Sequence, residues 1–251
     1  MADAAVLPVR VVGAPWVRGA VDVPQGPAPA GSLAAIPVRT RLVDVGDDIA
    51  AVVAGAVRGI AGPGDVIAVS ETAVAIAQGR IVAAERIRPS KLAYALSQRA
   101  GALATVNQPE SLQLVIDRVG AWKVLYAAAM HVAGRLRGRR GAFYEILGDA
   151  IATIDGYTGT MPPFERSIVF GPDDPDGVSR SIAERCGAHA AVVDVNDLGA
   201  AKILGSSGGV DAERLARALR TNPHGNGDEQ TPIVVFAWRG SGPSPLLEGG
   251  R

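Results

Sequence analysis

The stretch Asp65-Val-Ile-Ala-Val-Ser70 decides the fold class of this 251-residue chain. It is a short, continuous apolar run that follows a turn of glycine and proline, which is typical of a strand buried on both faces of a sheet. A helix is predicted just before it, over residues 47–61, because the apolar positions from Ile49 to Ile60 recur with helical spacing. Asp47 is the predicted N-cap of that helix.

The same alternation of strands and helices continues along the chain. Strands are predicted at 36–43, 65–70, 150–155, 189–195 and 233–238, and helices at 47–61, 179–187 and 211–220. The glycine-rich segment 196–209 is expected to be a loop. Strands that alternate with helices predict a mixed α/β (α+β) fold rather than an all-helical one.

The pattern changes in three places, which suggests a domain organisation. Residues 1–35 are rich in Ala, Pro and Gly and predict an N-terminal arm with one short strand at 9–13. Residues 89–148 consist of helical segments and predict a helical insertion or subdomain. The α/β core then comprises residues 36–88 and 149–240, and residues 241–251 are expected to form a loose tail.

Composition excludes several classes of protein. The 25 basic residues balance the 25 acidic ones, so no net charge attracts nucleic acid or anionic lipid. One cysteine and three scattered histidines argue against a disulfide framework and a Cys- or His-rich metal site. No signal peptide is recognisable, and the longest nearly charge-free stretch, residues 49–57, is too short to span a membrane. We therefore expect a cytoplasmic protein that binds neither nucleic acid nor membranes.

Two familiar sequence motifs are tested and set aside. Neither G-x-x-x-x-G-K-[ST] nor a G-x-G-x-x-G after a strand is present. Residues 205–209 (GSSGG) match G-x-S-x-G, with Ser207 at the position of a hydrolase nucleophile. That motif needs a helix directly after the serine, whereas the better helix start is Asp211. We expect a glycine-rich loop here and no nucleophilic serine.

Aspartates follow two of the predicted strands and are candidate metal ligands. Asp194 comes at the carboxyl end of a strand, the position where ligands bind in α/β sheets, and Asn196 and Asp197 follow it. Carboxylate and amide oxygens suit Mg²⁺ or Mn²⁺. A simple turn capped by Asp197 explains the same residues equally well. Asp155 also ends an apolar run, and both aspartates are expected to meet at one sheet edge.

Two further segments have the composition of anion-binding sites. Residues 225–230 (GNGDEQ) combine glycines, which let the backbone approach a ligand, with polar side chains just before a strand. Residues 135–141 (RLRGRRG) form a local basic patch that suits phosphate. For both segments the alternative is an ordinary solvated surface.

Short motifs in a fixed order connect these features. They are Arg39-Thr40, Gly46-Asp47-Asp48, Asp65–Val69, Gln78-Gly79-Arg80, Ile154-Asp155, Asp174–Gly177, Val193-Asp194 and Gly225–Val235. In this order the chain resembles the γ-glutamyl ligase family of coenzyme F-420 biosynthesis, over about four fifths of its length. Members of that family add glutamate to the tail of a deazaflavin coenzyme, using GTP and a divalent metal.

The resemblance implies a γ-glutamyl-ligase-like fold, a homodimer, and a ligase that uses GTP or ATP with Mg²⁺ or Mn²⁺ to join glutamate to a deazaflavin. It implies roles for residues of three kinds. Catalytic and metal-binding roles fall to Asp155 and Asp194, with Asp197 as a further metal ligand. Nucleotide binding falls to Arg39, Thr40, Ser70, Gly225, Asn226, Gly227, Asp228 and Gln230, and substrate binding to Arg80 and Asn196.

The chain also departs from the family pattern. Ile76 stands where the family has a nucleotide-contacting lysine, Val195 stands where it has a threonine, and an arginine-rich segment is missing. Three hypotheses therefore remain: a deazaflavin γ-glutamyl ligase, a ligase of the same fold for a different acid and amine, and a non-catalytic ligand-binding homologue.

Overall fold

The computed structural model describes residues 6–8, 32–99, 107–139, 141–148, 154–155, 163–195, 199–225 and 229–250. The chain divides into two compact units. Unit 1 comprises Met1–Gly79 and Pro172–Arg251, and unit 2 comprises Arg80–Gly171. The chain therefore leaves unit 1 once, after Gly79, and returns to it at Pro172.

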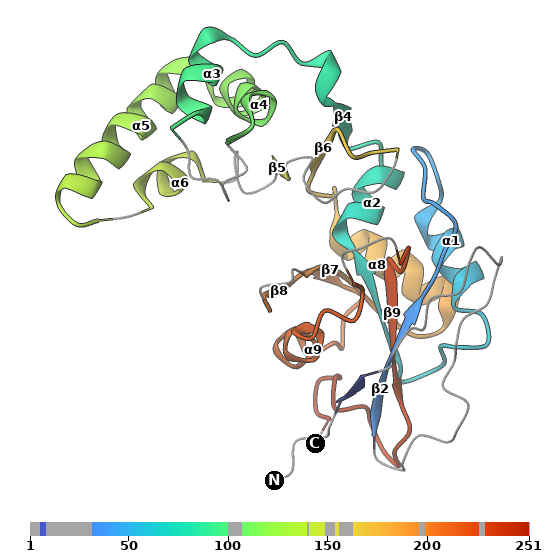
Figure 1. Ribbon diagram of the computed structural model, residues 1–251. Coiled ribbons are helices and arrows are strands. Elements are labelled where there is room, and N and C mark those ends of the chain that lie inside the picture. The colour runs from blue at the N-terminus through green and yellow to red at the C-terminus, as the bar shows by residue number, and fades with distance from the viewer. Residues whose placement is uncertain are drawn as a thin grey trace. The chain divides into compact units, whose positions relative to one another are not determined.

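Unit 1 is built on a mixed six-stranded sheet (Figure 1). In spatial order its strands are β1 (Val6–Pro8), β2 (Leu33–Val38), β9 (Ile233–Trp238), β3 (Val66–Ser70), β7 (His189–Val195) and β8 (Ala201–Ser206). β1 runs parallel to β2, and β3 runs parallel to β7. The other neighbouring strands are antiparallel.

Both faces of this sheet are buried, as the apolar run 65–70 predicted. On one face, alternate residues such as Val66, Ala68 and Val193 form a core with Leu215 and Leu219 of α9 (Ala212–Leu219). The residues between them on β3 and β7 are buried as well, facing the other side. There α8 (Pro175–Cys186) packs on β7 and β8 and against α1 (Ile49–Ala56), and α2 (Glu71–Ala77) packs on β3 and β7.

Unit 2 combines a small sheet with helices. Its strands lie in the order β4 (Ile81–Ala83), β6 (Ser167–Phe170) and β5 (Ile154–Asp155), all antiparallel. Its helices are η1 (Ala84–Arg86), α3 (Lys91–Ser97), α4 (Pro109–Val119), α5 (Ala121–Leu136) and α6 (Ala142–Leu147). Their apolar residues pack with Ile154 and Ile168 of the sheet into one core. None of the described helices combines the length and the apolar composition needed to cross a membrane.

The mixed α/β fold class is confirmed, and the described part of residues 89–148 contains the helices α3 to α6 and their short connections. The unit that holds these helices is larger than the segment 89–148. It begins at Arg80 and ends at Gly171, because the flanking strands β4, β5 and β6 pair with each other and share the core of the helices.

Several boundaries differ from the sequence prediction. The strand predicted at 36–43 is β2, which spans Leu33–Val38, so the last residues of the predicted arm belong to the sheet. The expected loop 196–209 contains β8, paired antiparallel with β7. The strand predicted at 9–13 lies outside the described residues.

The C-terminal segment 241–250 is not loose. Leu246 is only 3% exposed and belongs to the core under α9, and Leu247 forms a bridge with Val210. Composition suggested a tail because glycine, proline and serine dominate the segment. The two leucines are enough to anchor it, since each buried apolar side chain contributes roughly 1.5–3 kcal/mol.

Candidate functional site

One edge of the unit 1 sheet collects most of the predicted site residues. β9 runs antiparallel to β2 and β3, so the carboxyl ends of β2 and β3 lie beside the start of β9, and Val38 and Val69 both pair with Ile233. β7 runs parallel to β3 and ends at the same edge, where Ser70 pairs with Val193. Ligands of α/β sheets bind at this kind of edge.

The segment that leads into β9 is hydrogen-bonded to the ends of the neighbouring strands. The Thr40 backbone N–H donates to the Gln230 carbonyl at 3.1 Å, and the Ser70 N–H donates to the Pro232 carbonyl at 2.8 Å. The Arg39 Nε donates to the Glu229 carbonyl at 2.8 Å. Four residues predicted to bind nucleotide, Arg39, Thr40, Ser70 and Gln230, are therefore brought together.

Ser70 and Arg39 retain groups that can bind an anion. Ser70 is the N-cap of α2, yet its hydroxyl makes no capping hydrogen bond, and the residue is half-buried. Arg39 is exposed and contacts Glu229 only through Nε among the described residues, which leaves its terminal guanidinium nitrogens for a partner. A hydroxyl and a guanidinium are both groups that bind a phosphate or a carboxylate.

A buried histidine closes the base of the loop before β9. His224 Nδ1 contacts the Thr231 carbonyl at 3.2 Å, and the Thr231 hydroxyl donates to the His224 carbonyl. Burial lowers the pKa of His224 to about 4, so the ring is neutral and Nδ1 carries the proton that is donated. Nε2 is then a buried acceptor, and it has no partner in the described part of the chain.

This closure was missed by sequence reasoning. The sequence predicts an anion-binding site at the glycine-rich residues 225–230. The two residues that join the ends of this loop, His224 and Thr231, flank that segment. Both residues fall in the polar segment between a predicted helix and a predicted strand, so only the folded chain shows that they are paired. Gly225 itself adopts a φ of +70°, which explains the need for glycine there.

Asp194 lies at the same edge, near the end of β7. It pairs across the sheet with Lys202 of β8. Burial raises the pKa of the Asp194 carboxyl, and the positive charge of Lys202 partly opposes this rise. A cation near Asp194 would stabilise the charged form of this carboxyl, as Lys202 does.

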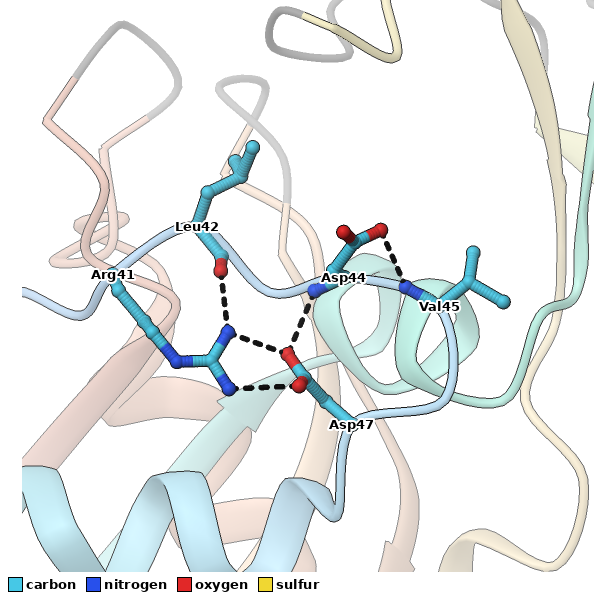
Figure 2. Close-up of polar contacts among 5 residues, drawn as sticks. All are labelled: Arg41, Leu42, Asp44, Val45 and Asp47. Atoms are coloured by element: carbon cyan, nitrogen blue, oxygen red, sulfur yellow. Dashed lines mark hydrogen bonds and ion pairs between the residues drawn. The ribbon is translucent and has the colours of Figure 1, made fainter.

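The connection from β2 to α1 is stiffened by an ion pair (Figure 2). Both terminal nitrogens of Arg41 donate to the Asp47 carboxylate at 2.7 Å, and the Asp44 N–H donates to the same group at 2.8 Å. The hydrogen bond from Arg41 lowers the pKa of Asp47 to about 2. Asp47 is therefore not the N-cap of α1 as predicted; Asp48 is, accepting from the Ala51 N–H at 3.1 Å.

Two predicted site residues belong to unit 2, whereas the sheet edge described above belongs to unit 1. Arg80 donates through Nε to the Gly171 carbonyl, so its guanidinium is at least partly engaged within unit 2. Asp155 ends β5, whereas Asp194 belongs to unit 1. A shared metal between Asp155 and Asp194 stays a prediction.

Five predicted residues lie outside the described residues: Asn196, Asp197, Asn226, Gly227 and Asp228. Within the part of the chain that the structure describes, no three His, Cys, Asp or Glu side chains gather as a metal site would require. Asp194 is therefore the one predicted metal ligand whose surroundings are described.

The serine of the GSSGG segment sits in a structural position. The Ser207 hydroxyl accepts from the Ala190 N–H at 3.0 Å, and α9 starts only at Ala212, capped by Asp211. Gly205 is needed for packing, since a Cβ there would lie 2.5 Å from the Asp176 backbone nitrogen. The arrangement lacks the strand–serine–helix turn of a hydrolase, in agreement with the sequence argument, and the inertness of Ser207 stays a prediction.

Comparison with known proteins bears on this geometry. Residues 37–134, less than half of the chain, match the model of the family F420-0:Gamma-glutamyl ligase. The match runs from the end of β2 to the last turns of α5, so it includes Arg39, Thr40, Ser70 and Arg80 and part of the predicted helical insertion. A search of the curated proteins found no match. Over residues 37–134 the chain is thus similar to the family F420-0:Gamma-glutamyl ligase, the family that its motifs resemble.

Proposed function

We propose that this protein is a metal- and nucleotide-dependent ligase that forms an amide bond between a carboxylic acid and an amine. The observation that carries the proposal is the sheet edge of unit 1, where Arg39, Ser70 and Asp194 lie at the ends of β2, β3 and β7, in a chain that matches the γ-glutamyl ligase family over residues 37–134. By resemblance the acid and amine are the deazaflavin tail and glutamate, and the nucleotide is GTP or ATP.

Amide formation from a carboxylate needs activation, typically by phosphoryl transfer from the nucleotide. In the proposed mechanism Arg39 and the Ser70 hydroxyl bind phosphate oxygens and keep the nucleotide at the ends of β2 and β3. The backbone of the loop that His224 and Thr231 close contributes N–H donors. These groups act by positioning and by neutralising the charge that develops on the transferred phosphoryl group.

A divalent metal fits the chemistry of the donor set that follows β7. Asp194, Asn196 and Asp197 would supply hard oxygen ligands, because carboxylate and amide oxygens suit Mg²⁺ and Mn²⁺. When bound, Mg²⁺ or Mn²⁺ would neutralise phosphate charge. Asp155 of unit 2 is proposed as a further ligand, and Arg80 as a contact to the acidic substrate.

A second candidate is a ligase of the same fold that joins a different acid and amine. Ile76 favours it, because this residue lies in α2, is only 6% exposed and has no charge with which to contact a nucleotide. The family lysine at this position thus has no replacement at the same site. Loss of the contact between this lysine and the nucleotide would change the preference of the enzyme for its nucleotide or for its substrate.

The test is an activity assay with the full chain. Purified protein is incubated with GTP or ATP, with Mg²⁺ or Mn²⁺, and with glutamate and the deazaflavin coenzyme, and products are identified by mass spectrometry. We expect a product heavier by one glutamyl residue together with release of nucleoside diphosphate. Nucleotide hydrolysis driven by other acids and amines would favour the second candidate, and absence of nucleotide binding would favour a non-catalytic homologue.

Asp194→Asn tests the metal role separately. The amide keeps the shape of the carboxylate but removes its charge, so we expect metal-supported nucleotide binding to weaken by more than about tenfold, since even residues that only orient a ligand are worth 10–100-fold. Isothermal titration with Mn²⁺ and GTP measures this. Glu213→Gln, the same change on the exposed face of α9, is the matched control. Equal affinity of Asp194→Asn and wild type would remove Asp194 from the metal site.

A further inference from the structure

Helix α5 of unit 2 exposes large apolar side chains along one face. Trp122 is 85% exposed, Leu136 is 84% exposed, and Tyr126 and Val132 are more than half exposed. We call this face the α5 stripe; it consists of Trp122, Leu125, Tyr126, Ala129, Val132, Ala133 and Leu136. The members share one face because they recur at intervals of three and four along the helix. Exposed apolar surface gathered in this way marks an interaction site.

The stripe cannot turn inward, because the opposite side of α5 packs inside unit 2. Val124 and Ala127 are fully buried in the core of unit 2, where α5 packs against α4 and α6 (Figure 1). His131 packs edge-on against Phe143 of α6. The side of α5 that faces away from the stripe is therefore covered by protein, which takes the place of the polar face that an isolated amphipathic helix turns to water.

Basic residues border the stripe on both sides. Lys123 and Arg135 lie six positions before and six positions after Ala129, the central residue of the stripe. At about 100° per residue, each lies about 120° of rotation from Ala129, and the two lie on opposite flanks. Both residues are exposed, and α5 contains no acidic residue. Long basic side chains in this position run beside an apolar surface and place their charges at its border.

More positive charge follows at the C-terminal end of α5. Arg137 and Arg139 are exposed. Arg139 contacts the Glu145 carboxylate at 3.5 Å, and both side chains are more than half exposed, so water screens this ion pair. Guanidinium groups bind phosphate oxygens well. This end of the helix therefore favours an anionic partner that contains phosphate.

The zero net charge of the whole chain conceals two units of opposite charge. Unit 2 contains 12 of the 25 basic residues and 7 of the 25 acidic ones, a net charge of +5. Unit 1 contains the other 13 basic and 18 acidic residues, a net charge of −5. The expectation that the chain binds no membrane rests on the balance of the whole chain. It does not extend to unit 2 taken by itself.

We propose that the α5 stripe and the basic residues around it attach unit 2 to the surface of a membrane that contains anionic lipids. Trp122 and Tyr126 suit the headgroup layer, because their rings are apolar at one end and polar at the other. The aliphatic side chains of the stripe enter the boundary of the acyl chains, while the basic residues meet lipid phosphates. Such attachment needs no helix that crosses the membrane, and it does not depend on the ligase chemistry proposed for unit 1.

Two other partners match only part of this surface. A nucleic acid would pair with the arginines and stack its bases on the aromatic rings, but it offers no apolar partner to Leu125, Val132 and Leu136. A second copy of the chain bound through the stripe would bring together two units of charge +5, which repel each other. An anionic lipid surface satisfies both the apolar and the basic residues.

The first measurement is co-sedimentation of the full chain with vesicles, made either of equal parts phosphatidylglycerol and phosphatidylcholine or of phosphatidylcholine alone. We expect wild type to bind the anionic vesicles more tightly by about tenfold or more. Trp122→Glu and Leu136→Glu should each weaken this binding by about tenfold or more. Val45→Glu, the same change at a residue of unit 1 that is 55% exposed, is the matched control and should bind as wild type does. Circular dichroism of each variant verifies folding.

The second measurement separates the charge at the end of α5 from the charge of the whole chain. Arg135→Gln combined with Arg137→Gln should weaken binding to the anionic vesicles about 25-fold, since each basic residue near a membrane surface is worth about fivefold. Arg217→Gln combined with Arg220→Gln removes the same charge from exposed positions at the end of α9 in unit 1. This control should change the affinity by less than about twofold, because salt screens distant charges. An equal loss in both double variants would overturn the proposal.

The third measurement tests whether the stripe enters the lipid. Lipids with brominated acyl chains quench the fluorescence of a tryptophan that they contact. Wild type should be quenched, whereas Trp122→Phe should still bind but lose the part of the quenching that is due to Trp122. Equal quenching of the two proteins would contradict the proposal. Wild type that stays in solution with both kinds of vesicle, or that binds no vesicle but self-associates in the ultracentrifuge until Trp122→Glu abolishes this, would do so as well.

Discussion

His224 illustrates how a single residue links the candidate site to stability. The ring is buried and neutral in the folded protein, with its pKa lowered to about 4. The unfolded chain takes up a proton near the ordinary pKa of 6.5, so the unfolded state binds more protons between pH 4 and 6.5. The free energy of unfolding is then fully retained above pH 6.5 and falls as the pH drops toward 4.

We predict a loss of about 2 kcal/mol in the free energy of unfolding between pH 7 and pH 5 from this residue. Urea denaturation at the two pH values measures it. His224→Gln should lower stability at pH 7 but flatten this part of the pH dependence. His189→Gln, at a partly exposed histidine whose Nδ1 contacts the Gly208 carbonyl, should leave the slope in place. The same slope in wild type and His224→Gln would contradict the assignment.

At this scale the sequence predicted residue types better than residue roles. Arg39, Thr40, Ser70 and Asp194 were assigned to the site because they follow apolar runs or match motifs, and the strand order brings them to one edge. Asp47 was assigned as a cap because it precedes an apolar helix. Its role instead depends on Arg41, and a bidentate pair between loop residues leaves no periodic signal in the sequence.

Strand β8 was missed because its formation depends on tertiary neighbours, which a local sequence pattern does not contain. Residues 196–209 were expected to be a loop because glycines and serines surround a short apolar core. The segment forms a strand because β7 offers it an antiparallel partner and α9 covers Ile203. Such tertiary context outweighs local β-propensity, which varies with the neighbours of a strand.

Gly205 of β8 provides the test at this scale. A Cβ at this position would lie 2.5 Å from both the Asp176 backbone nitrogen and the Pro175 backbone carbon. Because these are backbone atoms at the start of α8, β8 and α8 would have to separate. We predict that Gly205→Ala lowers the free energy of unfolding by about 2–3 kcal/mol, as for other overpacked cores, measured by urea denaturation.

Gly55→Ala is the matched control. Gly55 lies inside α1, and a Cβ there would meet nothing within 4 Å. Alanine is favoured over glycine in a helix, so stability should rise by about 0.5–1 kcal/mol. If both substitutions had the same effect, close packing of β8 on α8 would not be the reason for glycine at position 205.

At the scale of the whole molecule, the two places where the chain crosses between units lie side by side. The Gln78 side-chain amide donates to the Asp173 carbonyl at 2.8 Å, and its carbonyl accepts from the Asp173 N–H at 2.8 Å. Both residues belong to unit 1, one at its last turn before Gly79 and one just after its return at Pro172. Unit 2 is thus inserted into unit 1 through two neighbouring points, an arrangement that natural domain insertions commonly use.

This arrangement predicts that unit 1 folds without unit 2. In the test protein, residues 80–171 are replaced by a short Gly-Ser linker that joins Gly79 to Pro172. The sheet, its helices and the His224–Thr231 closure all lie within unit 1. We expect a protein with a cooperative thermal transition, followed by circular dichroism. Adding Gln78→Ala should lower its Tm, because the clamp that holds the two crossing points would be lost.

The shortened protein also separates the parts of the proposed function. Arg39, Ser70 and Asp194 remain, so nucleotide should still bind, with affinity measured by isothermal titration against GTP and Mn²⁺. Asp155 and Arg80 are removed with unit 2, so amide formation should be lost. A folded protein that no longer binds nucleotide would mean that the nucleotide site needs residues of both units. A protein without a cooperative transition would mean that the core of unit 1 depends on unit 2.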